Sequence, residues 1–199
     1  MIAEVKGVTA RFGSRTLFEG LSFGLAEGDL CSLVGRSGSG KTTLLLLLAG
    51  LLQPASGQVV RHVPDAGVAY VPQAPSLVPE LTAAQNASLA LRVRGEDPAV
   101  ALTEARNALS SLGLEDAWDA LPAQLSRGMQ QRVALARVLA AKPRFLLADE
   151  PTGTLDRDTG HHVVGVLLAT CAALGTTLVV ATHDDDLAAR FPKRLELAA

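Results

Sequence analysis

The sequence of 199 residues lacks several features that assign proteins to particular classes. Its longest apolar run covers residues 44–52, which is too short to cross a bilayer because a spanning helix needs roughly 20 residues. Residues 1–6 contain no basic segment followed by a long apolar stretch, so we expect no signal peptide. These absences indicate that any connection to a membrane comes through a partner protein.

The chain also has little excess charge and few cysteines. Its formal net charge is −2 and its pI is near 6.1, and this balance gives no electrostatic footprint for nucleic acid. We therefore expect no nucleic-acid partner. Cys31 and Cys171 lie far apart in apolar segments and show no metal-binding spacing. They are expected to be reduced core residues of a cytoplasmic protein.

Strands are expected near both ends of the chain and helices in its middle. Hydrophobic patterns predict strands at 5–12, 21–25, 30–34, 68–71, 145–148, 176–181 and 194–197, and helices at 42–52, 82–94, 98–112, 125–141 and 157–173. A parallel sheet with crossover helices accommodates this order. We therefore predict an α/β fold in a single domain, residues 1–199, whose core is 1–73 and 142–199 and whose inserted helical subdomain is 74–141.

A glycine-rich segment joins the strand at 30–34 to the helix that follows it. Its residues fit the Walker A pattern: Gly35, Arg36, Ser37, Gly38, Ser39, Gly40, Lys41 and Thr42. Glycines allow backbone N–H groups to approach phosphate oxygens, and the N-terminus of a helix favours anions. Lys41 supplies a full charge at the β- and γ-phosphates, and the Thr42 hydroxyl can ligate Mg²⁺. The alternative is a flexible Gly/Ser turn, which the flanking strand and helix disfavour.

Two adjacent carboxylates end the apolar strand at 145–148. In a protein with a Walker A loop, this position of Asp149 and Glu150 matches a Walker B arrangement. Asp149 would hold Mg²⁺, directly or through water, and Glu150 could polarise the attacking water. The plain alternative is that both acids cap the next helix.

Residues 125–132 narrow the class of protein. They read Leu-Ser-Arg-Gly-Met-Gln-Gln-Arg and resemble the LSGGQ signature of ATP-binding cassette (ABC) ATPases with its usual Gln-Arg. The segment begins a helix, so Ser126 and the next N–H groups form a second phosphate site. In that family this site faces the γ-phosphate held by another subunit. The resemblance therefore implies that catalysis needs two chains.

The other motifs of the family follow in order, so the resemblance covers nearly the whole chain. Phe12 is at the position of the aromatic residue that stacks on adenine, and Gln73 matches the Q-loop glutamine. Residues 151–156, which end at Asp156, resemble the D-loop, and His183 matches the switch histidine. Two residues depart from the signature, because Arg127 replaces its first glycine and Met129 its glutamine.

The resemblance implies a P-loop NTPase fold, with a RecA-like core, an antiparallel β edge and an inserted helical subdomain. It implies a Mg²⁺-dependent ATPase with Glu150, His183 and Gln73 in catalysis, and with Thr42, Gln73 and Asp149 at the metal. It assigns ATP binding to Phe12, Gly35, Arg36, Ser37, Gly38, Ser39, Gly40, Lys41, Thr42, Thr43, Ser126, Gly128 and Asp156.

The partners that the resemblance implies are a second ABC ATPase subunit, in a homodimer, and an integral membrane permease subunit. The chain would then be cytoplasmic and peripheral on the inner face of the cell membrane, and ATP-driven dimerisation would power transport. Residues 149–156 and 77–82 look like the group of lipoprotein-releasing, macrolide-exporting and cell-division ABC ATPases.

The motifs leave one other function open and disfavour two more. The same motifs would serve an ABC ATPase that drives a mechanical or regulatory membrane complex without transport. An ABC protein that acts on nucleic acid or ribosomes is disfavoured, because those usually carry tandem cassettes or long insertions. A GTPase is disfavoured because the sequence has no Asn-Lys-x-Asp guanine motif.

Overall fold

The computed structural model describes residues 1–13 and 15–197, apart from the side chain of Phe12, and forms two compact units. The first unit comprises Met1–Tyr70, Pro143–Glu150 and Cys171–Ala199, and the second comprises Val71–Lys142 and Pro151–Thr170. The second unit therefore includes residues 151–170, which the sequence assigned to the core. Contacts within this unit explain the difference, because His162 Nε2 lies 3.2 Å from the carbonyl oxygen of Ser111.

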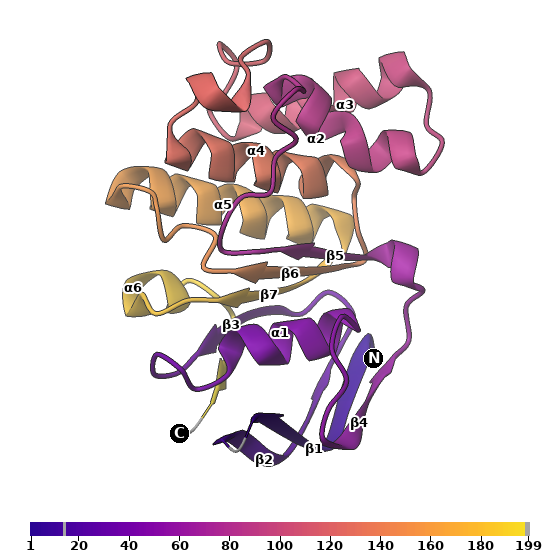
Figure 1. Ribbon diagram of the computed structural model, residues 1–199, viewed down its shortest axis with the longest axis vertical. Coiled ribbons are helices and arrows are strands. Elements are labelled where there is room, and N and C mark those ends of the chain that lie inside the picture. Colours follow the sequence, from indigo (N-terminus) through magenta and orange to yellow (C-terminus); the bar gives the residue numbers. More distant parts are fainter. Residues whose placement is uncertain (14, 198–199) are drawn as a thin grey trace. The chain divides into compact units, whose positions relative to one another are not determined.

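A five-stranded sheet forms the centre of the first unit (Figure 1). Its strands are, in spatial order, β5 (Val68–Val71), β6 (Phe145–Asp149), β7 (Thr177–Ala181), β3 (Leu30–Val34) and β8 (Lys193–Glu196). Every residue of β6 and β7 is buried, as expected for parallel strands covered on both faces. Asp149 lies opposite Ala181, and Ala181 lies opposite Leu33. This register brings the carboxyl ends of β6, β7 and β3 to one edge, where ligands of open α/β sheets bind.

A second, three-stranded sheet is antiparallel. It consists of β2 (Arg15–Leu25), β1 (Ala3–Phe12) and β4 (Ser56–Arg61), in that order. The helix α1 (Lys41–Ala49) contacts strands of both sheets, which is why it is leucine-rich around most of its circumference (Figure 1). Leu44, Leu45, Leu47 and Leu48 are at most 2 % exposed.

Most of the strands and helices predicted from sequence are present, with two main differences. The strand β4 was not predicted because it begins with Ser56 and Gly57, two poor strand formers. Gly57 is needed there, since a Cβ would lie within hard contact of the Gly7 backbone. The helix α1 ends at Ala49 and not at residue 52, because Gly50 adopts a left-handed conformation and its N–H bonds to Leu46 and Leu47 carbonyls.

Four helices account for most of the second unit: α2 (Ala83–Val93), α3 (Pro98–Ser111), α4 (Arg127–Ala140) and the greater part of α5 (Arg157–Leu174). The helices α2, α3 and α4 pack against one another. A capping box between Thr82 and Gln85 begins α2, and Asp97 caps α3 with its side chain. The remaining short elements are the 3-10 helices η1 (Asp65–Gly67) and η2 (Pro122–Gln124) and the helix α6 (Asp185–Ala188).

Both cysteines are buried and free, as the sequence predicted. Burial raises the pKa of Cys31 to about 11 and that of Cys171 to about 12, so both thiols stay protonated at neutral pH.

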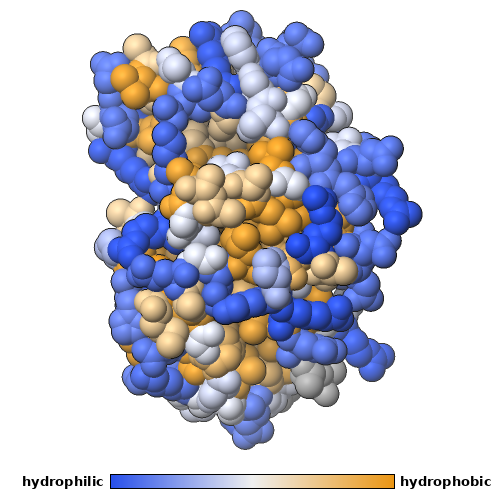
Figure 2. Space-filling model, turned by 180° about the vertical axis from the view of Figure 1, so that it is seen from behind, coloured by the Kyte–Doolittle hydropathy of each residue, from blue (hydrophilic) through white to orange (hydrophobic). Residues whose placement is uncertain are grey.

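None of the helices in the described part of the chain is long and apolar enough to cross a membrane. The face shown in Figure 2 is largely hydrophilic, with apolar residues gathered near the centre of the view.

Candidate active site

The Walker A residues form a tight loop between β3 and α1. The Lys41 ammonium donates to the carbonyl oxygens of Gly35, at 2.8 Å, and Arg36, at 3.3 Å. Gly35 leaves no room for a side chain, because a Cβ would lie 2.8 Å from Ser39 Oγ and 2.9 Å from the Leu197 carbonyl oxygen. The loop therefore folds back on itself, and its lysine is held at the N-terminus of α1, where an anion is favoured.

The start of β2 supports this loop from the other side. Gly40, which immediately precedes α1, has φ 98°, and a Cβ there would lie 3.0 Å from the Phe18 ring. Phe18 itself is buried, so the ring has little freedom to move away. Glycine is thus required at position 40 both by its backbone conformation and by its neighbour.

We expect Gly40→Ala to lower the free energy of unfolding by about 1–3 kcal/mol and to weaken ATP binding, because strain and crowding both act on the loop. Thermal unfolding and ATP titration measure the two effects. Gly95→Ala is a matched control, since Gly95 also has a left-handed φ of 87° but faces open space. Equal losses in both variants would show that the Phe18 contact has no role.

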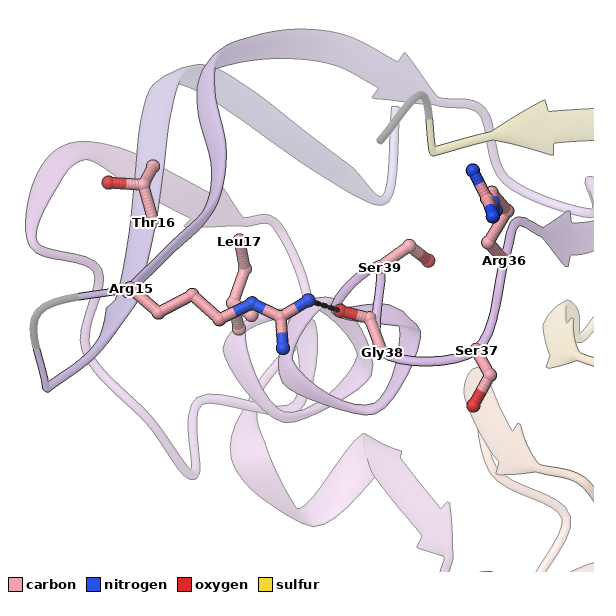
Figure 3. A pocket seen from close by; sticks show the side chains of 7 residues that line it. All are labelled: Arg15, Thr16, Leu17, Arg36, Ser37, Gly38 and Ser39. Atoms are coloured by element: carbon pink, nitrogen blue, oxygen red, sulfur yellow. Dashed lines mark hydrogen bonds between the residues drawn. The ribbon is translucent and has the colours of Figure 1, made fainter.

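A pocket of about 310 Å³ opens between the Walker A loop and β2 (Figure 3). Its described lining consists of Arg15, Thr16, Leu17, Arg36, Ser37, Gly38 and Ser39. The Arg15 guanidinium donates to the Gly38 carbonyl oxygen at 3.4 Å. Arg15 was not predicted from the sequence, and no spacing rule indicates it, because its place depends on how β2 packs against the loop.

An acid–hydroxyl pair lies at the end of β6. Thr42 Oγ1 donates to Asp149 Oδ2 at 2.7 Å, and Asp149 is only 3 % exposed. Tyr70, the third residue of β5, also hydrogen-bonds to Asp149, and its place here was not predicted from the sequence. Burial, together with the Asp149 charge and this bond, raises the pKa of Tyr70 to about 12. The phenol therefore remains a hydrogen-bond donor to the carboxylate throughout the physiological pH range.

Glu150 and His183 form a second pair at the same edge. Glu150 adopts a left-handed conformation, φ 46°, which is unusual for a residue other than glycine and marks a strained turn. Its N–H donates to the Ala181 carbonyl, and its Oε2 lies 2.8 Å from His183 Nδ1. The Glu150 side chain is 12 % exposed and that of His183 is 74 % exposed. A carboxylate that is nearly buried, next to an accessible imidazole, suits proton handling.

The signature segment begins α4 in the second unit. The Ser126 hydroxyl accepts from the Met129 N–H at 3.2 Å and so caps the helix. Gly128 is tightly packed, because a Cβ there would lie 2.9 Å from Leu155 Cδ2, a residue of the segment that resembles the D-loop. Ser126 and Arg127 are exposed, whereas Met129 is half-buried. Arg127 and Met129, the two residues that depart from the signature, thus differ in solvent exposure.

The remaining predicted site residues lie in separate places. Asp156 Oδ1 accepts from the Thr159 N–H at 2.9 Å at the start of α5, and this hydrogen bonding holds the pKa of Asp156 below its usual range. Gln73 is exposed two residues after the end of β5. Thr43 is half-buried in the first turn of α1. Phe12 ends β1, but its side chain lies outside the described part of the chain, so its contact with adenine stays a prediction.

Comparisons with known proteins match this arrangement. A family described as "ABC transporter" matches residues 18–153. The chain is 41 % identical to the ABC transporter ATP-binding protein YbbA of Escherichia coli (strain K12), over 92 % of this chain and 86 % of that protein. It is also 41 % identical to the lipoprotein-releasing system ATP-binding protein LolD of Gluconobacter oxydans, over 97 % and 91 %.

A solved structure of the same kind is the dimeric bacterial ABC transporter cassette MJ0796. It superposes with a TM-score of 0.89 at 32 % identity and covers 98 % of this chain and 94 % of that chain. The fold, with its phosphate loop and with Asp149 and Glu150 at the carboxyl end of β6, defines a nucleotide-hydrolysing P-loop protein. The chain belongs to the ABC transporter family. It is an ATP-binding and ATP-hydrolysing subunit that powers an ABC transporter.

Proposed function

We propose that two copies of the chain bind two Mg-ATP molecules between them and hydrolyse the ATP in sites that both copies complete. The observation that carries this proposal is the alignment of two side-chain pairs at one sheet edge: Thr42 with Asp149, and Glu150 with His183. Lys41 and the loop before it lie at the same edge, where β3 ends. A phosphate chain, a cation and a water molecule can therefore be held by groups from neighbouring strands.

The donor set fits Mg²⁺. The Thr42 hydroxyl and the Asp149 carboxylate already lie 2.7 Å apart, and both are the hard oxygen ligands that this ion prefers. Tyr70 also hydrogen-bonds to this carboxylate. Gln73 would add an amide oxygen, as the family resemblance implies. When bound, Mg²⁺ would neutralise part of the charge on the β- and γ-phosphates.

Glu150 and His183 would serve the hydrolysis step. Glu150 would accept a hydrogen bond, and then the proton, from a water molecule that attacks the γ-phosphorus. The bond between the γ-phosphorus and the bridging oxygen breaks, which yields ADP and inorganic phosphate. Lys41 and the loop amides stabilise the charge that develops on the phosphate oxygens. The His183 imidazole, fixed by Glu150, would contact the γ-phosphate side.

The second copy would supply the signature segment. Ser126 is exposed, and the first turn of α4 carries no acidic residue, so the start of this helix can accept an anion. A related cassette has been solved as a dimer in a post-hydrolysis state with ADP and Pi, which supports the same arrangement here. Asp156 would contribute to nucleotide binding near this interface.

We expect Ser126→Arg to stop ATP turnover almost completely, because a bulky cation replaces the hydroxyl that caps the phosphate-binding turn. Arg127→Gly should change turnover less than about threefold, since Ser126 and Gly128 retain the donors that phosphate needs. Steady-state ATPase assays of both variants test the pair. A tenfold loss of ATP-driven dimerisation in Arg127→Gly would instead identify Arg127 as a phosphate ligand.

The proposed membrane partner is an integral permease subunit, docked near the segment after Gln73, with the chain on the cytoplasmic face of the membrane. The named relatives support this, since they are transporter and lipoprotein-releasing ATP-binding proteins. A buried asparagine and a half-buried arginine hydrogen-bond to the backbone of this segment. Asn86 Oδ1 accepts from the Val78 N–H, and Asn86 Nδ2 donates to the Val78 carbonyl oxygen. Arg137 donates to the Ser76 carbonyl oxygen at 2.9 Å. A fixed shape of this kind suits a docking surface.

We expect Leu77→Asp and Leu81→Asp to abolish co-purification of the permease subunit from native membranes while ATP affinity stays within about twofold of wild type. Both leucines are half-buried on the fixed segment, so a charge there opposes burial in an interface. Val93→Asp is a control, because Val93 is 80 % exposed at the end of α2. Intact co-purification of the Leu77 and Leu81 variants would place the contact elsewhere.

A further inference from the structure

Arg15 faces the nucleotide loop from a different element of the fold. It is the first residue of β2, and its guanidinium reaches across the pocket of Figure 3 to the carbonyl oxygen of Gly38. That bond is long, 3.4 Å, and therefore weak. A guanidinium carries five N–H donors, so most of its hydrogen-bonding capacity remains available to a ligand.

The charge of the pocket favours an anion. Two of its described lining residues, Arg15 and Arg36, are cationic, and none of the described lining residues is acidic. Ser39 also lines the pocket and is 5 % exposed as a residue. Its buried hydroxyl, which points away from Arg15 in Figure 3, has no hydrogen-bond partner among the described residues. A buried hydroxyl without a partner is costly unless a ligand uses it.

The position of the pocket indicates which part of the nucleotide enters it. Lys41 and Thr42, which serve the β- and γ-phosphates, are not among its described lining residues. The remaining charged group of ATP is the α-phosphate. We infer that Arg15 is a nucleotide-binding residue that contacts the α-phosphate, with Ser39 beside it. This inference rests on the proposed function, and it adds a cation outside the Walker A motif.

The test is a titration of the purified chain with ATP, ADP and GTP, each in the presence of Mg²⁺. Arg15→Gln should raise the Kd of all three nucleotides by about tenfold, the size expected for one lost charge-assisted contact. It should also reduce the dependence of Kd on salt, because one ionic contact is removed. Arg15→Lys should recover only part of the affinity, since an ammonium lacks the planar fork.

Arg11→Gln is the matched control. Arg11 is exposed on β1, beside Thr16 in the strand pairing, and is outside the described pocket lining, so this variant removes the same charge without the contact. Affinities unchanged in Arg15→Gln, or equally reduced in Arg11→Gln, would overturn the inference. A loss for ATP without a loss for GTP would assign Arg15 to the base and overturn the α-phosphate contact. By contrast, unchanged affinity in Lys41→Ala would count against the proposed function itself.

Discussion

Glu150→Gln is expected to slow ATP hydrolysis by about a hundredfold or more while ATP still binds, the range for loss of a positioned general base. Glutamine keeps the size and the polar contacts of Glu150 but cannot take the proton of the attacking water. This variant changes only the nearly buried carboxylate, whose Oε2 lies 2.8 Å from His183 Nδ1. Release of phosphate under single-turnover conditions measures the chemical step, and nucleotide titration checks that binding survives.

The ATP-bound dimer should accumulate in this variant, because hydrolysis is what would end it. Glu19→Gln is a matched control, since Glu19 is an exposed residue of β2, which belongs to the three-stranded sheet and not to the sheet that carries Glu150. It should hydrolyse ATP at the wild-type rate. Near-normal turnover in a contaminant-free Glu150→Gln preparation would remove Glu150 from the role of base and would direct attention to another proton acceptor.

Lys41→Ala should abolish tight binding of Mg-ATP. The ammonium lies at the N-terminus of α1, and it is held in the loop by the carbonyls of Gly35 and Arg36. Loss of a charged hydrogen-bond donor to phosphate costs about 3 kcal/mol, or roughly a hundredfold in Kd. Isothermal titration calorimetry gives this number directly.

The control for Lys41→Ala is Lys6→Ala, because Lys6 is an exposed residue of β1 whose ammonium pairs with Glu4. It should bind ATP as the wild type does. The thermal unfolding of both variants shows whether the fold is kept. A Lys41→Ala protein that is folded and binds ATP with unchanged affinity would contradict the role of the Walker A loop described above.

Much of the fold could be predicted from sequence because its central strands are buried on both faces. Such strands read as continuous apolar runs, as at 145–149 and 177–181. The antiparallel sheet was harder to predict, since most residues of β2 are exposed and β4 begins with the exposed residues Ser56, Gly57 and Gln58. β4 lies on β1 through backbone pairing around Gly57, and a local pattern of side chains carries no sign of such a pairing.

The site was predictable to the extent that its residues are neighbours in sequence. The Walker A loop and the pair Asp149–Glu150 each follow a strand directly, so motif and context could be assessed together. Arg15 and Tyr70 could not be found in this way. Each acts across strands or layers, and their positions depend on packing that no short motif encodes. The strained backbone of Glu150 was equally invisible in the sequence.

Mixing two inactive variants tests most directly whether two chains share each site. Lys41→Ala has an impaired phosphate loop but an intact signature segment. Ser126→Arg has an impaired signature segment but an intact phosphate loop. In a head-to-tail pair of the two, one site combines the intact loop of one chain with the intact signature of the other. We expect the mixture to hydrolyse ATP well above the sum of the separate variants. A mixture that stays inactive at every ratio, while both variants are folded, would contradict the shared site.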